Sequence, residues 1–491
     1  MRRVIGREEE QKELLGAIES NAPEFIALYG RRRVGKTYLV KNTLSERKGI
    51  LFFLVTGIKD GLLSTQLQNF MTAIGETFFY KGAPLETPEN WNKAFSVLND
   101  NIKASPKKKI VLFFDEFPWM ATQNSYLLQM LEYYWNHYWS NNPKIKLIIC
   151  GSSAGWILKN IINNRGGLYN RVTRTIQLEP FSLHQVKKFL AHQKVVLSNK
   201  QIIQIYMVLG GIPHYLSKIK PGHTSQQTIE ELAFKKNSFL LQEFNNLYAT
   251  LFSTDTGHIE LARIIAQHHY GIGQEELAQK ALHISSGGSF VRWLEDLEEA
   301  GFIQRFKPFL ARKKGIYYKM IDEYSLFYFD WIEPLKETLL GKGMRKGYWE
   351  TKLHTPAWYS WTGYSFESVC YKHIPQISIA LKLSPSAVPY AWRFAPTKSS
   401  SENGAQIDLL FDRDDGAITV CEIKYTDQPF AIDKQYAEKL TNKIGVFKAK
   451  TKTKKDIFLA FVSASGLKKT MYSEAMVSGI VDADDLFSKA D

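Results

Sequence analysis

Residues 25–37, FIALYGRRRVGKT, decide the fold class of the first part of the chain. An apolar run is followed by the complete pattern G-x-x-x-x-G-K-[ST], from Gly30 to Thr37. Gly30 and Gly35 let backbone N–H groups close around phosphate oxygens, because no Cβ is in the way. Lys36 places a compact charge on the β- and γ-phosphates, and the Thr37 hydroxyl can bind Mg²⁺. A complete match between a strand and a helix disfavours an ordinary glycine turn and predicts a site for ATP and Mg²⁺.

Residues 110–116, IVLFFDE, form a second apolar run, which ends in two carboxylates. Parallel α/β sheets bind ligands at the carboxyl ends of their strands. We therefore expect Asp115 to hold Mg²⁺, partly through water, and Glu116 to polarise the attacking water as a general base. One solvated acid at a strand end is common, but two of them downstream of a phosphate loop favour ATP hydrolysis.

The first 180 residues alternate apolar runs with helical patterns, which is typical of an α/β domain with a parallel sheet. The predicted strands cover residues 24–30, 50–55, 109–116, 144–153 and 173–180. Residues from Pro180 to about Ile229 have a helical pattern and are a candidate lid over the nucleotide.

The composition is that of an ordinary globular protein of several domains: 491 residues, 44% hydrophobic and 23% charged. The formal net charge of +14 suits a polyanionic partner, either nucleic acid or the phosphates of a nucleotide. Three distant cysteines make a disulfide framework and a zinc cluster improbable. Because neither a secretory signal nor a long apolar run is visible, we expect a soluble cytoplasmic protein without a membrane span.

A winged helix-turn-helix pattern follows at residues 256–335. Three short helices are predicted over 258–268, 273–282 and 289–300, and a hairpin over 302–320. The basic residues of this hairpin are Arg305, Lys307, Arg312, Lys313, Lys314 and Lys319. They suit phosphate contacts with DNA or RNA, but the helix at 289–300 carries Glu295, Asp296, Glu298 and Glu299, which would repel phosphates. Nucleic-acid binding and packing against the ATPase core therefore both stay open. Glycines and polar residues predict a linker over 336–356.

The last region, residues 357–491, holds a second chemical constellation. Residues 407–411 and 418–424 read as two strands of a hairpin, which brings Asp408 and Glu422 to one face with Lys424. Two carboxylates can hold Mg²⁺, and a lysine beside the metal can offset the charge that develops during phosphodiester hydrolysis. Glu367, on a helix predicted over 366–374, is a candidate further ligand.

Residues 1 to about 335 resemble the AAA-like ATPases of archaea and bacteria, on the branch related to STAND NTPases. Val4-Ile5-Gly6-Arg7-Glu8 is similar to the family's adenine-side box, and GRRRVGKT is a habitual spelling of its phosphate loop. Cys150-Gly151-Ser152-Ser153 resembles the sensor segment, in which Ser152 would detect the γ-phosphate. Leu168-Tyr169-Asn170-Arg171 resembles the segment with an arginine finger; Arg171 competes there with Arg165 and Arg174. Residues 210–216, GGIPHYL, resemble the lid motif that includes Pro213.

Residues from Glu367 to about Tyr436 look like the Asp…Glu-x-Lys core of restriction-endonuclease-like domains, with Gln435 and Tyr436 on the following helix. The fold expected for the whole chain is therefore a P-loop NTPase sheet with a helical lid (1–180 and 181–255), a winged helix (256–335), a linker (336–356) and a restriction-endonuclease-like α/β domain (357–491). The expected nucleotide-binding residues are Ile5, Gly6, Arg7, Gly30, Arg31, Arg32, Arg33, Val34, Gly35, Lys36, Thr37, Tyr38 and Pro213. The expected catalytic residues are Lys36, Glu116, Ser152, Arg171, Asp408, Glu422 and Lys424. The expected metal ligands are Thr37, Asp115, Asp408 and Glu422.

Two functions follow from this organisation. In the first, the nucleotide state of an ATPase controls a nuclease-like domain that acts on nucleic acid. In the second, the chain is a STAND-like switch or scaffold, in which ATP controls self-association or association with a protein partner and the last domain is an inactive binding module.

Overall fold

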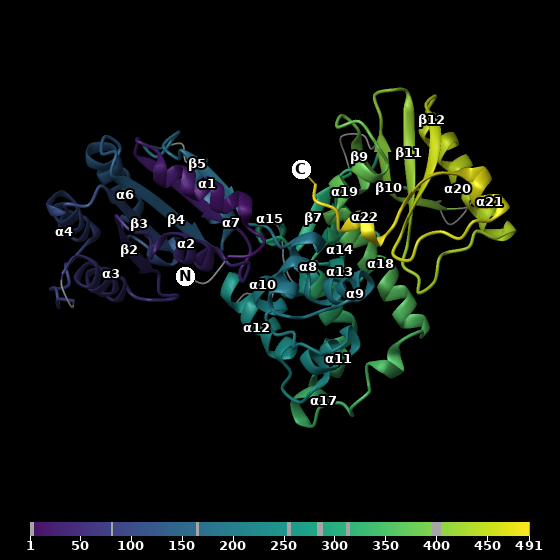
Figure 1. Cartoon of the computed structure of the whole chain (residues 1–491), viewed down its shortest axis with the longest axis horizontal. Helices are drawn as coiled ribbons and strands as arrows, with labels where there is room; N and C mark the ends of the chain where they lie inside the picture. The colour runs from purple at the N-terminus through teal and green to yellow at the C-terminus, as the bar shows by residue number, and fades with distance from the viewer. Residues whose placement is uncertain are drawn as a thin grey trace. The chain divides into compact units, whose positions relative to one another are not determined.

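The structure, a computed structural model, describes residues 4–79, 82–163, 166–252, 257–281, 288–310, 315–394 and 404–490. The chain divides into two compact units, Met1–Pro180 and Phe181–Asp491 (Figure 1). Four residues named in the predictions, Arg165, Arg312, Lys313 and Lys314, lie outside the described residues.

The first unit is built on a five-stranded sheet of order β2-β3-β4-β1-β5, in which all neighbouring strands run parallel. Its strands are β1 (Glu24–Tyr29), β2 (Ile50–Thr56), β3 (Lys109–Asp115), β4 (Ile145–Gly151) and β5 (Arg174–Gln177). These confirm the five strands predicted from the apolar runs. β1 and β4 are buried along their whole length, as expected for a parallel sheet covered on both faces. The chain segments that leave β1, β3 and β4 therefore meet at one edge of the sheet.

Helices surround this sheet and supply most of its core. They are α1 (Glu8–Glu19), α2 (Lys36–Leu44), α3 (Leu63–Phe78), α4 (Trp91–Ala104), α5 (Phe117–Met120), α6 (Leu127–Tyr134), the π-helix η1 (Trp135–Trp139), α7 (Ala154–Ile157) and the π-helix η2 (Leu158–Ile162). Phe70, Phe95 and Phe114 are fully buried in aromatic contact between the sheet and helices α3 and α4. This aromatic packing holds the sheet and its helices together, and so it positions the carboxyl ends of β1, β3 and β4, where the polar residues lie.

The second unit begins with the helices of the candidate lid. They are α8 (Leu183–His192), α9 (Asn199–Leu209), α10 (Pro213–Leu216), α11 (Ser225–Ile229), the π-helix η3 (Glu230–Phe234) and α12 (Phe239–Leu251). Reciprocal capping boxes start α8, α9 and α11, which explains why these short helices begin where they do. Helical structure over the lid segment is confirmed, and these residues cluster with the rest of the second unit.

Residues 257–320, the helix–ribbon segment, contain the elements predicted for a winged helix. They are α13 (Gly257–Ala266), β6 (Ile272–Gly273), α14 (Gln274–Lys280), α15 (Gly288–Glu299), β7 (Ile303–Phe306) and β8 (Tyr317–Met320). The three strands pair antiparallel in the order β6-β8-β7. Two basic residues of the expected phosphate-contacting surface have acidic partners instead: Arg305 pairs with Glu298, and Lys319 is buried against Glu367. Lys319 is therefore buried and does not belong to the exposed basic surface expected on this hairpin.

Residues 336–356 were expected to be a linker, and the structure corrects this. The segment follows α16 (Glu323–Phe327), the π-helix η4 (Tyr328–Ile332) and the 3-10 helix η5 (Glu333–Leu335), and contains α17 (Lys336–Gly341) and the 3-10 helix η6 (Glu350–Lys352). Trp349 is 1% exposed and packs against Phe234, Phe327, Trp331 and Trp361. Trp349 therefore anchors this segment to the core of the second unit, while Gly341, Lys342, Arg345 and Lys346 are exposed.

The last region is a mixed sheet of order β13-β12-β11-β10-β9, antiparallel among β9, β10 and β11 and parallel among β11, β12 and β13. Its strands are β9 (Val388–Phe394), β10 (Ala405–Asp412), β11 (Ala417–Lys424), β12 (Asp456–Ser463) and β13 (Val477–Val481). Its helices are α18 (Pro356–Lys372), α19 (Ile374–Ala380), α20 (Lys434–Thr451), α21 (Met471–Met476) and α22 (Ala483–Leu486). The predicted hairpin is confirmed, whereas the helix expected over 366–374 already begins at Pro356, where Thr355 caps it.

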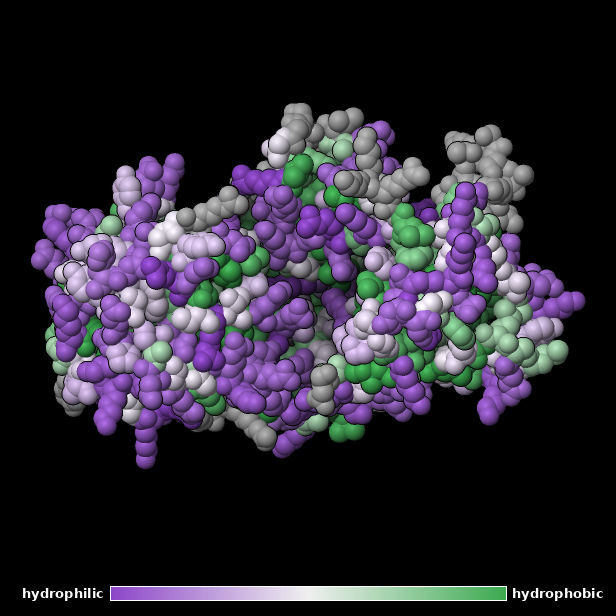
Figure 2. Space-filling view, turned by 90° about the horizontal axis from the view of Figure 1, so that it is seen from above, coloured by the Kyte–Doolittle hydropathy of each residue, from purple (hydrophilic) through white to green (hydrophobic). Residues whose placement is uncertain are grey.

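The face of the molecule seen in Figure 2 is mainly hydrophilic, with hydrophobic residues in smaller groups. In the described part of the chain, no helix combines the length and the apolar character that a membrane crossing requires. Cys150, Cys370 and Cys421 are buried and free.

Candidate functional site

The phosphate loop occupies the turn between β1 and α2. Gly30 has a φ of 148°, and a Cβ built there would lie 2.2 Å from the Leu178 carbonyl oxygen. Gly35 has a φ of 97° and stands directly before α2. Both positions therefore need glycine, the first because of its neighbour and the second because of its left-handed backbone. The loop presents the N-terminus of α2, a favourable position for an anion.

Lys36 is 5% exposed and lies across the loop. Its Nζ donates to the carbonyl oxygens of Gly30 at 2.8 Å and Arg31 at 3.1 Å, and to Ser152 Oγ at 3.1 Å. These three acceptors satisfy the ammonium group within the protein. A phosphate group can replace the two neutral carbonyls by a charged acceptor, which makes a stronger hydrogen bond.

Thr37 and Asp115 lie together, as the two sequence patterns predict. Thr37 Oγ1 donates to Asp115 Oδ2 at 2.9 Å. Burial raises the pKa of Asp115 above its usual value, and nearby Glu116 adds to this, although the Thr37 hydrogen bond opposes it. Asp115 Oδ1 is buried and has no hydrogen-bond partner among the described residues. An unsatisfied carboxylate oxygen beside a threonine hydroxyl is a donor set that fits Mg²⁺.

Glu116 follows β3 in a left-handed conformation, with a φ of 45°. This backbone geometry is costly for a residue with a Cβ, and such residues concentrate at functional sites. The carboxylate accepts the backbone N–H of Ser152 at Oε2, 3.0 Å away, and the Ser152 hydroxyl at Oε1. Ser152 thus contacts both Glu116 and Lys36, so the expected sensor residue lies at the centre of the polar network.

The segment expected on the adenine side contacts the loop through Arg7, which is 4% exposed. Its guanidinium donates to the carbonyl oxygens of Val34 at 3.3 Å and Glu179 at 2.6 Å, and pairs with Glu10. Arg7 therefore ties the chain after β5 to the phosphate loop. Of its neighbours, Ile5 is buried and Gly6 has a φ of 70°.

The remaining predicted residues of the first site have different surroundings. Arg174, the competing finger candidate, is paired with Glu24 at 3.3 Å. Arg171 is exposed, and Tyr38 is 44% exposed on α2. Arg31 is buried, and Arg32 and Arg33 are half-buried in the loop. Pro213 begins α10 and belongs to the second unit.

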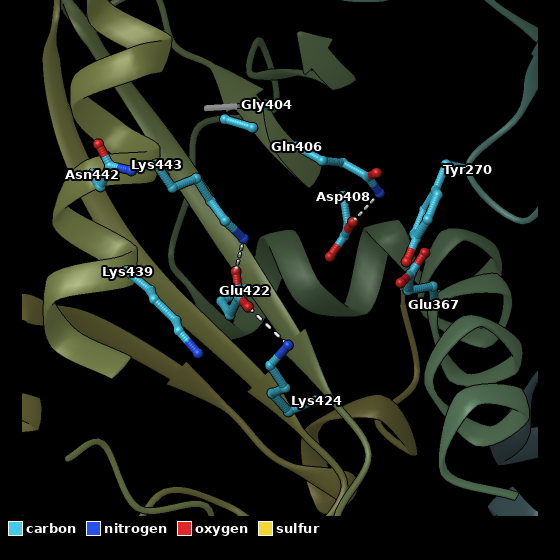
Figure 3. A pocket seen from close by; sticks show the side chains of 11 residues that line it. Tyr270, Glu367, Gly404, Gln406, Asp408, Glu422, Lys424, Lys439, Asn442 and Lys443 are labelled. Carbon is cyan, nitrogen blue, oxygen red and sulfur yellow. Dashed lines mark hydrogen bonds and ion pairs between the residues drawn. The ribbon is translucent and has the colours of Figure 1, made fainter. Parts of the chain in front are cut away.

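The carboxylates of the last region line a cavity of about 530 Å³ in the second unit. Its lining residues are Tyr270, Glu367, Gly404, Ala405, Gln406, Asp408, Glu422, Lys424, Lys439, Asn442 and Lys443 (Figure 3). The structure therefore brings Asp408, Glu422, Lys424 and Glu367 to one place, as the sequence predicts. Tyr270 comes from the helix–ribbon segment, so two regions of the chain build this cavity.

Glu422, on β11, is surrounded by donors. Its Oε1 pairs with Lys424 Nζ at 2.9 Å, its Oε2 with Lys443 Nζ at 2.6 Å, and the Tyr436 hydroxyl donates to Oε1. Burial alone would raise the pKa of Glu422, but the two lysines and the tyrosine lower it to about 2. Glu422 is therefore an anion whose oxygens are already bound.

Asp408 has the opposite electrostatic environment. Burial, with Glu367 and Glu422 nearby, raises the pKa of Asp408 to about 7. Gln406 donates to its Oδ1 at 2.7 Å, and Figure 3 shows Asp408 and Glu367 apart from the Glu422 cluster. Across the residues that the structure covers, no group of three His, Cys, Asp or Glu side chains could hold a metal ion. The predicted metal ligands Asp408 and Glu422 thus share a cavity, but lysines already occupy the oxygens of Glu422.

Sequence reasoning missed Tyr270, Lys319 and Lys443. Lys443 could have been found, because it follows Tyr436 at the helical spacing that puts both on one face of α20. Tyr270, which lines the cavity, and Lys319, which pairs with Glu367, carry no such signal, since their positions depend on how the helix–ribbon segment packs.

Residues 5–219 match the model of a family described as an ATPase domain predominantly from Archaea. The match spans the phosphate loop, Asp115, Glu116 and Ser152, whose contacts form one network. Over these residues the chain is therefore similar to archaeal P-loop ATPase domains. Uncharacterized protein MJECL04 of Methanocaldococcus jannaschii is 27% identical to the chain over 428 residues, 86% of this chain and 88% of that protein. The chain also has a fold like that of the Walker-type ATPase PABY2304 of Pyrococcus abyssi: the TM-score is 0.50 and the identity 18%, over 66% of this chain and 96% of that chain.

Proposed function

We propose that the chain hydrolyses ATP with Mg²⁺ at the phosphate loop, and that its nucleotide state controls the nuclease-like region, residues 357–491, in an action on nucleic acid. Two sets of hydrogen bonds support the proposed ATP hydrolysis. Ser152 joins Lys36 to Glu116, and Thr37 donates to Asp115. Each residue type in this network has a defined task in phosphoryl transfer.

In this mechanism the triphosphate binds over the N-terminus of α2, and Lys36 exchanges its loop carbonyls for phosphate oxygens. Thr37 and Asp115 would hold Mg²⁺, which offsets negative charge on the phosphate oxygens when bound. Glu116 orients the attacking water and accepts its proton. Ser152 responds to the γ-phosphate, because it contacts both Lys36 and Glu116.

Four further contributions belong to the same proposal. Ile5, Gly6 and Arg7 line the adenine side, with Arg7 fixing the loop through Val34. Tyr38 and the loop arginines Arg31, Arg32 and Arg33 contact the nucleotide from α2 and the loop. Arg171, which is exposed, acts as the arginine finger, and Pro213 belongs to the lid motif.

Action of the last region on nucleic acid is supported by its chemistry. Asp408, Glu422 and Lys424 share a cavity with Lys439 and Lys443, and this excess of lysines suits a phosphodiester. The test is cleavage of DNA and RNA by the full chain with Mn²⁺, with and without ATP. Cleavage that needs ATP and disappears in both Lys36→Ala and Lys424→Ala would support the proposal; cleavage unaffected by Lys424→Ala would contradict it.

The second candidate is a switch in which the last region binds a partner without cutting. The observation that favours it is the closed environment of Glu422, whose oxygens are bound by Lys424, Lys443 and Tyr436. Under this proposal ATP changes self-association or the affinity for a protein partner. No cleavage under any nucleotide condition, together with an ATP-dependent change in mass by light scattering that Lys36→Ala abolishes, would favour the switch.

A further inference from the structure

Strand β8 of the helix–ribbon segment contributes a buried cation to the carboxylates of the C-terminal cavity. Lys319 Nζ lies 3.1 Å from Glu367 Oε2 on α18, and the two side chains are 10% and 11% exposed. Removing both charges from water is costly, and such a pair rarely adds stability over apolar packing. A buried ion pair between two regions of a chain therefore suggests a role beyond holding them together.

Lys319 is linked to Asp408 as well as to Glu367. Its ammonium group lies 4.6 Å from the centre of the Tyr371 ring, and the Tyr371 hydroxyl donates to the backbone carbonyl of Asp408. One lysine of β8 thus contacts the helix that carries Glu367 and, through Tyr371, the strand that carries Asp408. The helix–ribbon segment cannot move away from α18 without breaking these contacts.

Two of the three carboxylates that line the cavity, Glu367 and Glu422, are paired with lysines of the protein itself. Glu367 has Lys319, and Glu422 has Lys424 and Lys443, whereas Asp408 accepts a hydrogen bond from Gln406 and lies toward Glu367 in Figure 3. The resemblance to restriction-endonuclease-like domains implies a divalent metal ion, but these residues do not fit one as arranged, and no three-carboxylate group converges among the described residues. The positive charge that a metal would bring is supplied by lysines.

We propose that Lys319 excludes divalent metal ions from Glu367 and Asp408, so that a metal ion binds there only when the helix–ribbon segment withdraws this lysine. Withdrawal leaves Glu367 without its counter-charge beside Asp408, and a divalent cation relieves the repulsion between the two carboxylates. The inference rests on the proposed nuclease-like region, but it concerns the affinity of that region for metal ions. This affinity can be measured without ATP and without nucleic acid.

The test is a titration of the full chain with Mn²⁺ in the absence of nucleotide. Binding is measured as the decrease in the EPR signal of free Mn²⁺. All proteins carry Asp115→Asn, which removes the metal ligand of the ATPase site. We expect Lys319→Met to lower the Kd for Mn²⁺ by about tenfold or more. Adding Asp408→Asn should abolish the gain. Lys307→Met is the matched control, because Lys307 is an exposed lysine of the same ribbon and does not line the cavity.

Two results would overturn the proposal. The first is that Lys319→Met does not raise the affinity for Mn²⁺. The second is that the chain with Lys319 intact already binds Mn²⁺ tightly and loses this binding in Asp408→Asn. Amine labelling of Lys319, read by mass spectrometry, covers the case in which Lys319→Met does not fold. In the Asp115→Asn chain, labelling should be slow and should rise with millimolar Mn²⁺; unchanged labelling would contradict the proposal. If Mn²⁺ binds as expected but no nucleic acid is cut, the proposed nuclease action fails while this inference stands.

Discussion

Ser152 connects Glu116 to Lys36: its hydroxyl donates to Glu116 Oε1 and accepts a hydrogen bond from Lys36 Nζ at 3.1 Å, and its backbone N–H donates to Glu116 Oε2 at 3.0 Å. The serine at the end of β4 therefore couples the phosphate loop to the acid at the end of β3. A ligand that draws Lys36 toward itself changes the surroundings of Glu116 through one hydroxyl group.

Gly30→Ala should unfold or inactivate the first unit, because the added Cβ would lie 2.2 Å from the Leu178 carbonyl oxygen. We expect a loss of about 2–4 kcal/mol in the free energy of unfolding, from backbone strain and overpacking together. Gly49→Ala is the control: Gly49 also has a positive φ, 85°, but nothing lies within 4 Å of its added Cβ. It should cost only about 1 kcal/mol. Equal losses in denaturant unfolding would show that the contact with Leu178 has no effect.

Thr37→Val should reduce ATP turnover by about 100-fold, since it removes the hydroxyl that donates to Asp115 and faces the expected Mg²⁺ position. Thr43→Val, on the same helix α2, is the matched change. The Thr43 hydroxyl is buried and has no hydrogen-bond partner among the described residues. Steady-state ATPase assays with varied Mg²⁺ should find this variant within about twofold of the original chain. Similar losses in both variants would mean that Thr37 acts only through packing.

Much of the first site was predictable because its residues are close in sequence to strand ends. Lys36, Thr37 and Asp115 follow buried apolar runs, and a parallel sheet brings such ends together. The contact between Arg7 and the chain before Pro180 could not be predicted, because it joins residues 172 positions apart through a backbone carbonyl.

The C-terminal cavity was predictable only in part. The hairpin register follows from alternation along β10 and β11, so Asp408 and Glu422 were placed correctly. The pairing of Lys319 with Glu367 could not be predicted, because the burial of a lysine depends on tertiary packing that overrides its usual preference for solvent. The same reason explains the error at 336–356, where glycines and charges concealed the anchoring role of Trp349.

Trp349→Ala should destabilise the second unit by about 3–5 kcal/mol, because it empties the centre of a buried aromatic cluster. Tyr359→Ala, at a ring that is 52% exposed, should cost less than about 1 kcal/mol. Thermal unfolding measured with urea present separates the two. A Trp349→Ala chain as stable as the Tyr359→Ala chain would restore the linker interpretation of residues 336–356.

The stability advantage of Asp408→Asn over the original chain should grow as the pH rises. The folded-state pKa of Asp408 is raised to about 7, above its unfolded value, so its stabilising contribution is full below about pH 4 and is lost as the pH rises through 7. We expect Asp408→Asn to gain on the order of 3 kcal/mol in relative stability between pH 4 and pH 8. Asp456→Asn, at an exposed acid that begins β12, should show no such trend. A difference between Asp408→Asn and the original chain that is independent of pH in urea unfolding would contradict this environment for Asp408.

The central claim, ATP hydrolysis with Glu116 as the base, is tested most directly by ATP binding and turnover of Glu116→Gln. The amide keeps the shape of the side chain but cannot accept the proton of the attacking water. Glu76→Gln, at an exposed acid of α3, is the control and should behave as the original chain. The account predicts ATP affinity within about threefold of the original chain and turnover lowered by at least about 100-fold. Undiminished turnover in Glu116→Gln would contradict it.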